Sequence, residues 1–315
     1  YFLASLYFLF SNFAPKKNTN TIMHKAGFVN IVGNPNVGKS TLSNLLVGER
    51  LSIITSKAQT TRHRIFGIVN DENYQIVFSD TPGVLKPNYR LQESMLNYSK
   101  EALKDADILI YVTDTIETPD KYDDFVKAVE RLDIPVIVII NKIDLIDQKR
   151  LEELVEYWHE TLPQAEIIPT SALHSFNTKG IIDRIVELLP EAEPYYDKDA
   201  LTDKPERFFV NEIIREKILL YYKKEIPYSV EVEVEEFHDK GEQVDIRAII
   251  HVARESQKGI IIGHQGVALK KLGTLARRDI ERFLGKKVFL QLFVKVTKDW
   301  RDKDSLLKQF GYNVK

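Results

Sequence analysis

The chain contains no cysteine among its 315 residues. Disulfide bridges, zinc sites built from thiolates and cysteine nucleophiles are therefore excluded. The seven histidines show no metal-ligand spacing, and no Ser–His–Asp triad can be read from the chain. Long apolar runs are missing as well, because the apolar stretch at residues 1–13 is shorter than the roughly 20 residues that span a bilayer.

The first 22 residues differ in composition from the rest of the chain. Their apolar, aromatic stretch has no basic region before it, so it does not have the form of a signal peptide. Met23 precedes the first predicted strand and would suit a start of translation. We expect residues 1–24 to be a disordered appendage or a translated upstream stretch; a weak membrane-touching arm is the alternative.

Charge is unevenly distributed along a chain whose length suits two domains. The formal net charge is only −2, but residues 254–315 carry +9 and the remainder carries −11. A basic C-terminal segment on an otherwise acidic protein favours a polyanionic partner at that segment. A solvated basic face is the alternative.

The residues from Gly33 to Ser40 read Gly-Asn-Pro-Asn-Val-Gly-Lys-Ser, the phosphate-binding pattern G-x-x-x-x-G-K-S. An apolar strand is predicted before it, at residues 28–32, and residues 41–47 suit the start of a helix. The two glycines let backbone N–H groups curl toward phosphate oxygens, and the helix N-terminus adds partial positive charge. We expect the Lys39 ammonium to lie between the outer phosphates and the Ser40 hydroxyl to bind Mg²⁺.

Residues 25–190 alternate apolar strands with helices, which predicts an α/β domain with a mostly parallel sheet and helices on both faces. Expected strands are 28–32, 65–69, 74–78, 108–112, 136–140 and 166–169, and expected helices are 91–103, 122–132, 151–161 and 181–189. A short polar turn separates the second and third strands. This spacing predicts a hairpin, and hence one antiparallel edge strand.

Further polar motifs follow the later strands. Asp80-Thr81-Pro82-Gly83 follows the third strand, where Asp80 is expected to reach Mg²⁺ through a water and the Gly83 N–H to meet the γ-phosphate. Asn141-Lys142-Ile143-Asp144 follows the fifth. The Asp144 carboxylate suits the N1–H and N2 amine of guanine, whereas adenine would leave it unpaired.

The other side chains near the base have expected roles too. The Lys142 stem can lie over the purine, and Asn141 can tie its loop to the phosphate loop. In Ser171-Ala172-Leu173, after the sixth strand, the Ala172 N–H can meet guanine O6. In order and placement, these motifs resemble the signature of the GTPases, and the domain resembles a P-loop NTPase G domain.

The stretch from Gln59 to Ile65, Gln-Thr-Thr-Arg-His-Arg-Ile, resembles switch I of the Era-type GTPases. The resemblance implies that Thr61, rather than Thr60, supplies a second hydroxyl to Mg²⁺. Val84 stands where Ras-like enzymes have a glutamine that orients the attacking water. In this the chain resembles the translation-factor-related GTPases with a hydrophobic replacement, and the resemblance implies slow hydrolysis, with water placed by backbone groups or by a partner.

Beyond an acidic linker at residues 191–205, the pattern changes in residues 206–315. A helix is expected at 206–222, strands at 229–237 and 244–252, then a Gly-x-x-Gly turn, a helix at 267–284 and a strand at 288–296. This order resembles an α+β type II KH domain, which binds about four bases of single-stranded nucleic acid.

RNA contacts are expected around the Gly-x-x-Gly turn, where basic residues cluster on the segment with the +9 charge. An isoleucine run, Ile260-Ile261-Ile262, is expected to line the approach to this turn. The predicted RNA-binding residues are Lys258, Gly259, Ile261, Ile262, Gly263, His264, Gln265, Gly266, Lys270, Lys271, Arg277 and Lys295. For Trp300, a base-stacking platform and packing against the last helix are both open.

Together, the switch motif, the hydrophobic Val84 and the KH segment resemble the Era family from about residue 25 onward. The resemblance implies catalytic roles for Lys39, Thr61 and Gly83, and Mg²⁺ binding by Ser40, Thr61 and Asp80. The nucleotide contacts it implies are Gly33, Asn34, Asn36, Val37, Gly38, Lys39, Ser40, Thr41, Asp80, Gly83, Asn141, Lys142, Asp144, Ser171, Ala172 and Leu173. Asn36 matches the position at which potassium-stimulated relatives hold K⁺.

The family further implies a monomeric, GTP-hydrolysing ribosome assembly factor. Its KH domain would bind near the 3′ end of 16S rRNA and assist maturation of the 30S subunit. The family also implies a cytoplasmic location, with peripheral association with the inner membrane. A different function remains open on the residues alone: a constitutive RNA-binding module whose G domain is only structural.

Overall fold

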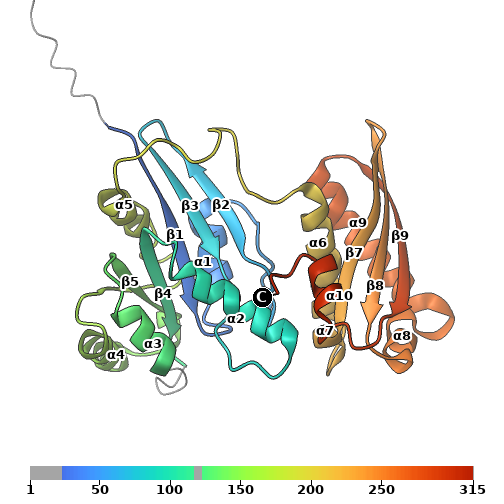
Figure 1. Cartoon of the computed structure of the whole chain (residues 1–315), viewed down its shortest axis with the longest axis horizontal. Helices are drawn as coiled ribbons and strands as arrows, with labels where there is room; N and C mark the ends of the chain where they lie inside the picture. The colour runs from blue at the N-terminus through green and yellow to red at the C-terminus, as the bar shows by residue number, and fades with distance from the viewer. Residues whose placement is uncertain (1–22, 117–122, 315) are drawn as a thin grey trace, which may run out of the picture.

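The structure is a computed structural model that describes residues 23–116 and 123–314. Two sheets lie side by side, each with its own helices, and the C-terminus returns to the space between them beside α2 (Figure 1). The appendage expected at residues 1–24 lies, apart from its last two residues, outside the described residues, as does Tyr122 of a predicted helix. None of the helices in the described part has both the length and the apolar character needed to cross a membrane.

The first sheet has six strands in the order β2-β3-β1-β4-β5-β6. Their bounds are β1 Lys25–Gly33, β2 Ile65–Asn70, β3 Tyr74–Asp80, β4 Ile108–Asp114, β5 Val136–Asn141 and β6 Glu166–Pro169. Every pair is parallel except β2–β3, a hairpin that leaves β2 antiparallel at the edge. The predicted strands and the antiparallel edge are therefore confirmed.

Helices cover both faces of this sheet. The first face carries α1 (Lys39–Val47) and α5 (Lys179–Leu188), and the second carries α2 (Arg90–Ala102), α3 (Asp123–Glu130) and α4 (Gln148–Thr161). Alternate residues of β4 serve the two cores: Ile108 and Ile110 pack in the first, Leu109 and Tyr111 in the second. Because both faces are buried, the strands read as continuous apolar runs.

The second sheet has the order β7-β8-β9, formed by β7 Val230–Asp239, β8 Gln243–Val252 and β9 Lys287–Val296. The β7–β8 pair is antiparallel and the β8–β9 pair is parallel. The longer helices that share one core with this sheet are α6 Glu206–Tyr221, α8 Glu255–Ile262 and α9 Val267–Leu284. The short helices are η2 Ile143–Leu145, α7 Ile226–Ser229, η3 His264–Gly266 and α10 Asp304–Gln309. The sequence predicted every long element here except α8.

The linker, residues 191–205, is fastened to the first domain. Ile68 in β2 donates a backbone hydrogen bond to the Leu201 carbonyl at 2.8 Å. The Gln75 side chain accepts from the backbone N–H groups of Tyr195 (2.7 Å) and Tyr196 (3.0 Å). The linker thus covers the open edge of β2, which would otherwise present unpaired backbone groups.

Candidate nucleotide and RNA sites

A cleft of about 560 Å³ lies at the edge of the first sheet where the parallel strands end. Open α/β sheets bind ligands at this edge. Segments far apart in the sequence line the cleft, namely residues 35–41, 53–61, 141–145, Gly83 and Leu173. The predicted phosphate, switch and base motifs therefore meet in one place. The sequence reasoning had not singled out the segment at residues 53–56.

The phosphate loop depends on its two glycines. Gly33 has φ +143° and Gly38 has φ +102°, a region that side chains rarely adopt. A Cβ at Gly33 would lie 2.1 Å from the Val112 carbonyl oxygen, and one at Gly38 would lie 2.1 Å from the Asn141 amide nitrogen. The loop therefore packs directly against the strand ends. Across it, the buried Lys39 ammonium donates to the Asn34 carbonyl at 2.7 Å.

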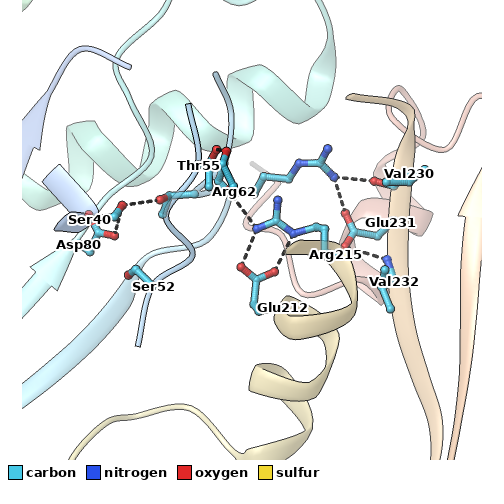
Figure 2. A network of polar contacts seen from close by, with 12 residues as sticks. Ser40, Ser52, Thr55, Arg62, Asp80, Glu212, Arg215, Val230, Glu231 and Val232 are labelled. Atoms are coloured by element: carbon cyan, nitrogen blue, oxygen red, sulfur yellow. Dashed lines mark hydrogen bonds and ion pairs between the residues drawn. The ribbon is translucent and has the colours of Figure 1, made fainter. Parts of the chain in front are cut away.

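Three hard oxygen ligands come together beside the loop. The Ser40 hydroxyl donates to Asp80 Oδ2 at 2.7 Å and lies 2.8 Å from the Thr61 hydroxyl (Figure 2). The Thr60 hydroxyl instead pairs with Thr55 at 2.7 Å. Two hydroxyls and a carboxylate suit Mg²⁺, which binds proteins through few oxygen ligands and keeps several waters.

Asp80 supports this reading of the cluster. The residue is 1% exposed, and its Oδ1 has no hydrogen-bond partner within the described residues. Burial raises the pKa of the Asp80 carboxyl, because desolvation disfavours its charge. A cation beside it would compensate this cost. Within residues 23–116 and 123–314, no group of three His, Asp or Glu side chains could hold another metal ion.

Asn141 holds the base-binding loops to the phosphate loop. Its amide nitrogen donates to the Val37 carbonyl at 2.8 Å, and its oxygen accepts from the Ala172 N–H at 2.9 Å. The tie to the phosphate loop is as expected. The partner of the Ala172 N–H differs from the prediction. This group donates to Asn141 within the protein and is not a free donor for guanine.

The base pocket itself is framed by charges. Asp144 accepts a hydrogen bond from the Ser171 hydroxyl at 2.5 Å, which orients its carboxylate. Lys142 donates to Asp114 at 2.5 Å and to the Asn36 carbonyl at 2.6 Å. Asp114 was missed in the sequence, although it ends a parallel strand on the same edge as the predicted motifs. Exposed apolar side chains also flank the pocket; they are Leu145 and Leu173.

Two residues of the switch regions are uncharged, the buried Val84 and the half-buried His63. Val84 is 4% exposed and packs in the core, so its side chain offers nothing to a water in the cleft. His63 stacks on Tyr312 with ring centroids 4.3 Å apart. Burial lowers the pKa of His63 to about 3, so the ring is neutral at pH 7.

A groove of about 450 Å³ runs between α9 and β9 in the second domain. Three of the predicted RNA-binding residues line it: Gly266, Lys270 and Arg277. The sequence reasoning missed the others, which are Leu269, Gly273, Thr274, Leu290 and Leu292. Their signal was present, because the α9 members recur every three or four residues and those of β9 alternate.

The Gly-x-x-Gly turn forms η3, ahead of α9. Gly263 and Gly266 have φ of +71° and +77°, and a Cβ at Gly263 would lie 2.6 Å from the Ala268 Cβ. Both inner residues, His264 and Gln265, are exposed. Lys271 and Lys295 are exposed as well, although neither lines the groove.

The isoleucine run before the turn does not line an approach to RNA as predicted. Residues 255–262 form α8, and consecutive helical residues point about 100° apart. Ile261 is therefore fully buried in the core, Ile262 is half-buried, and Ile260 is 49% exposed. Lys258 and Gly259 lie on the same helix and not in the turn. The prediction of Ile261 as an RNA-binding residue is wrong.

Trp300 is a packing residue. Its side chain is 0% exposed, and its indole N–H donates to the Ser229 carbonyl at 3.1 Å. Leu307 of α10, the last helix, shares its cluster, as do Leu91 and Met95 of α2. A base cannot stack on a fully buried ring, so the packing alternative is correct.

Comparisons with known proteins agree with this geometry. The family model described as "50S ribosome-binding GTPase" matches residues 28–142, and the KH domain model matches residues 225–301. Proteins named GTPase Era are similar over 92% of this chain. The one from Thermoanaerobacter sp. (strain X514) is 45% identical, with 97% of it covered, and the one from Alkaliphilus metalliredigens is 44% identical, with 99% covered.

Two solved structures are similar over the same 92% of the chain, each at 40% identity and each covered completely. One is Era in complex with MgGDPNP and nucleotides 1506–1542 of 16S ribosomal RNA, with a TM-score of 0.88. The other is a variant of Aquifex aeolicus Era bound to GDP and AlF4⁻, with a TM-score of 0.86. The chain therefore belongs to the Era family of GTPases, with a GTP-hydrolysing G domain followed by a KH domain.

Proposed function

We propose that this GTPase binds the 3′ end of 16S rRNA through its KH domain, under control of the bound nucleotide, and assists maturation of the 30S subunit. One observation carries the proposal: the same chain contains a cleft at the phosphate loop and a groove in the KH domain that is lined by basic residues. The Era structure with MgGDPNP and a 16S rRNA fragment, similar over nearly the whole chain, supports the choice of RNA.

At the phosphates, the loop N–H groups and the Lys39 ammonium would stabilise the charge that develops during hydrolysis. Ser40 and Thr61 would bind Mg²⁺ directly and Asp80 through a water; the bound ion would neutralise phosphate charge. The Gly83 N–H would meet the γ-phosphate. Because Val84 cannot orient a water, backbone groups or a partner would do so, and slow intrinsic turnover is expected.

At the base, Asp144 would accept from the N1–H and N2 amine of guanine, held in place by Ser171. Lys142, braced by Asp114, would cover one face of the purine, and the exposed Leu173 would pack near the other. The remaining predicted contacts are Gly33, Asn34, Asn36, Val37, Gly38, Thr41 and Asn141.

At the KH domain, the Gly-x-x-Gly turn would let RNA phosphates approach the backbone while bases enter the groove. Lys270 and Arg277 line that groove and would neutralise phosphates. The remaining expected contacts are Lys258, Gly259, Ile262, Gly263, His264, Gln265, Gly266, Lys271 and Lys295.

The RNA site is tested by placing two negative charges on the exposed turn. His264→Asp with Gln265→Asp should weaken binding of an RNA of nucleotides 1506–1542 about 30-fold, since each charge near a phosphate costs about 1 kcal/mol. GTP hydrolysis should be unchanged. The matched control is His159→Asp with Gln164→Asp, the same exchange on exposed residues of the G domain. Equal loss in both double variants would contradict the KH site.

A monovalent cation is proposed beside Asn36, a cleft residue whose carbonyl is already turned toward Lys142. Extra positive charge there would stabilise the transition state as an arginine finger does. Replacing Na⁺ by K⁺ should raise the hydrolysis rate by about tenfold or more, and Asn36→Ala should lose the difference. Identical rates in the two salts would refute this cation site.

A monomer in the cytoplasm, with peripheral association with the inner membrane, completes the proposal and rests on family resemblance alone. Sedimentation with lipid vesicles tests the membrane part. Protein that stays in the supernatant at every lipid concentration would contradict it.

A further inference from the structure

The switch segment Thr60–Arg62 is held by both domains at once. The Thr61 hydroxyl lies 2.8 Å from Ser40 in the phosphate cleft. The next side chain, Arg62, is 0% exposed and enters the KH domain (Figure 2). A movement of this short stretch toward or away from the phosphates would therefore move the point at which the KH domain is attached.

Arg62 makes a multiple anchor inside the KH domain. One terminal nitrogen donates to the Val230 carbonyl at 2.7 Å and to the Glu231 carboxylate at 3.1 Å. The other donates to the Pro227 carbonyl at 3.0 Å. A planar guanidinium fixes orientation as well as position when its donors are used in this way.

Arg215 makes the reciprocal contact, from α6 of the KH domain into the switch. It donates to the Thr60 carbonyl at 2.6 Å. Glu212, one turn earlier in α6, accepts two hydrogen bonds from the same guanidinium at 2.8 and 2.6 Å, which fixes its direction. The two ends of the segment Thr60–Arg62 are thus tied to the KH domain through two buried arginines, one from each domain (Figure 2).

Glu231 connects the contacts of Thr60, Arg62 and Arg215, here called the interdomain joint, to the C-terminal tail. Its carboxylate accepts from Arg62 and also from the Tyr312 hydroxyl at 2.6 Å. The tail continues against α2, where the Ser94 hydroxyl donates to the Asn313 carbonyl at 2.5 Å. The helix α2 follows the Asp80–Gly83 motif in the sequence. Both this motif, through α2 and the tail, and the switch segment, through Arg62, are therefore connected to the Glu231 carboxylate.

The joint also holds two unsatisfied groups. Arg62 Nε and Arg215 Nη1 are buried and have no hydrogen-bond partner among the described residues. An unpaired buried donor costs stability. A second arrangement of the domains that pairs these groups would recover this cost and so offset part of the bonds that it breaks.

We propose that Arg62 and Arg215 are positioning residues that transmit the nucleotide state of switch I to the KH domain, with Glu231 as the anchor of Arg62 and Glu212 as the anchor of Arg215. This inference rests on the proposed function, because it assigns residues to the coupling between GTP and RNA. Neither arginine touches the nucleotide in this assignment. The Arg62 variants should therefore bind GDP as the parent protein does.

The absence of cysteine makes a direct test possible. Glu160→Cys on α4 and Glu242→Cys between β7 and β8 place two spin labels on exposed positions, one in each domain. Pulsed EPR then measures the distance between them with Mg²⁺ and either GDP or GDPNP. The parent double-cysteine protein should show two different distances. Arg62→Gln should show the same distance distribution with GDP and with GDPNP. The ratio of its RNA affinities with GDPNP and with GDP should fall from the 5–150-fold range usual for such couplings to about one.

Further variants separate signalling from folding. Arg62→Lys keeps the charge but cannot reach three acceptors, so it should lose the distance change even if Arg62→Gln folds poorly. Arg90→Gln is the control, because Arg90 also bridges the domains but pairs with Asp304 at the surface; it should keep the change. A full distance change in Arg62→Gln and Arg62→Lys would overturn the inference alone. No change in the parent protein would contradict the proposed coupling itself, and the inference with it.

Discussion

Asp144→Asn should turn the protein from a guanine-nucleotide into a xanthine-nucleotide binder. The carboxylate can only accept hydrogen bonds, and guanine offers two donors on the edge it would meet. An asparagine amide would oppose the guanine amine with its own donors, whereas xanthine has a carbonyl oxygen at that position. Sites built to hydrogen-bond one edge reject the wrong one by about 10⁴-fold. We therefore expect GTP affinity to fall by ~10³–10⁴-fold and XTP affinity to rise.

Isothermal titration calorimetry with GDP and XDP measures the exchange. The matched control is Asp147→Asn, three residues further on, where the carboxylate caps α4 by accepting from the Arg150 N–H at 2.9 Å. Asparagine caps helices as well as aspartate does, so neither stability nor specificity should change. Unaltered GDP affinity in Asp144→Asn would show that the base is held elsewhere.

Lys39→Ala should abolish measurable hydrolysis while leaving RNA binding by the full chain, measured without nucleotide, intact. The buried ammonium is the positive side chain of the phosphate loop, and losing one preorganised donor to developing charge costs about 3–4 kcal/mol, or ~10²–10³ in rate. Single-turnover release of phosphate measures the effect. The thermal unfolding temperature of the variant should be measured as well, because Lys39 also donates to the Asn34 carbonyl and its loss could lower stability.

The control for this variant is Lys149→Ala, an exposed lysine on α4. Its turnover should equal that of the parent protein. If Lys39→Ala hydrolysed GTP at the parent rate, the cleft would not be the catalytic site. If it also lost RNA binding without GTP present, the two sites would not be separable as proposed.

The sequence predicted the first domain well because its signals are local and repeated. Motifs at the ends of parallel strands must meet at one edge, so Ser40, Asp80 and Asp144 could be brought together without coordinates. Asp114 was missed because a lone strand-end aspartate has no pattern of its own. The role of Ser171 in orienting Asp144 depends on a contact across 27 residues that no spacing indicates.

Two features that involve the second domain were harder to predict from the sequence. Ile260-Ile261-Ile262 is an apolar run that suits a groove, a strand or a helix equally, and only the packing of α8 decides which isoleucine is buried. The docking of Arg62 into the KH domain could not be predicted either. A basic residue beside a phosphate site reads as a solvent or phosphate contact, and its burial depends on where a domain 165 or more residues away is placed.

The central claim is that the nucleotide bound at the phosphate loop sets the affinity of the KH domain for RNA. It is tested most directly by measuring binding of nucleotides 1506–1542 of 16S rRNA to the full chain, with Mg²⁺ and saturating GDPNP or GDP. The account predicts tighter binding with GDPNP, by a factor within the 5–150-fold range typical of coupled sites. Equal affinity in the two nucleotide states would contradict it and would favour a constitutive RNA-binding module.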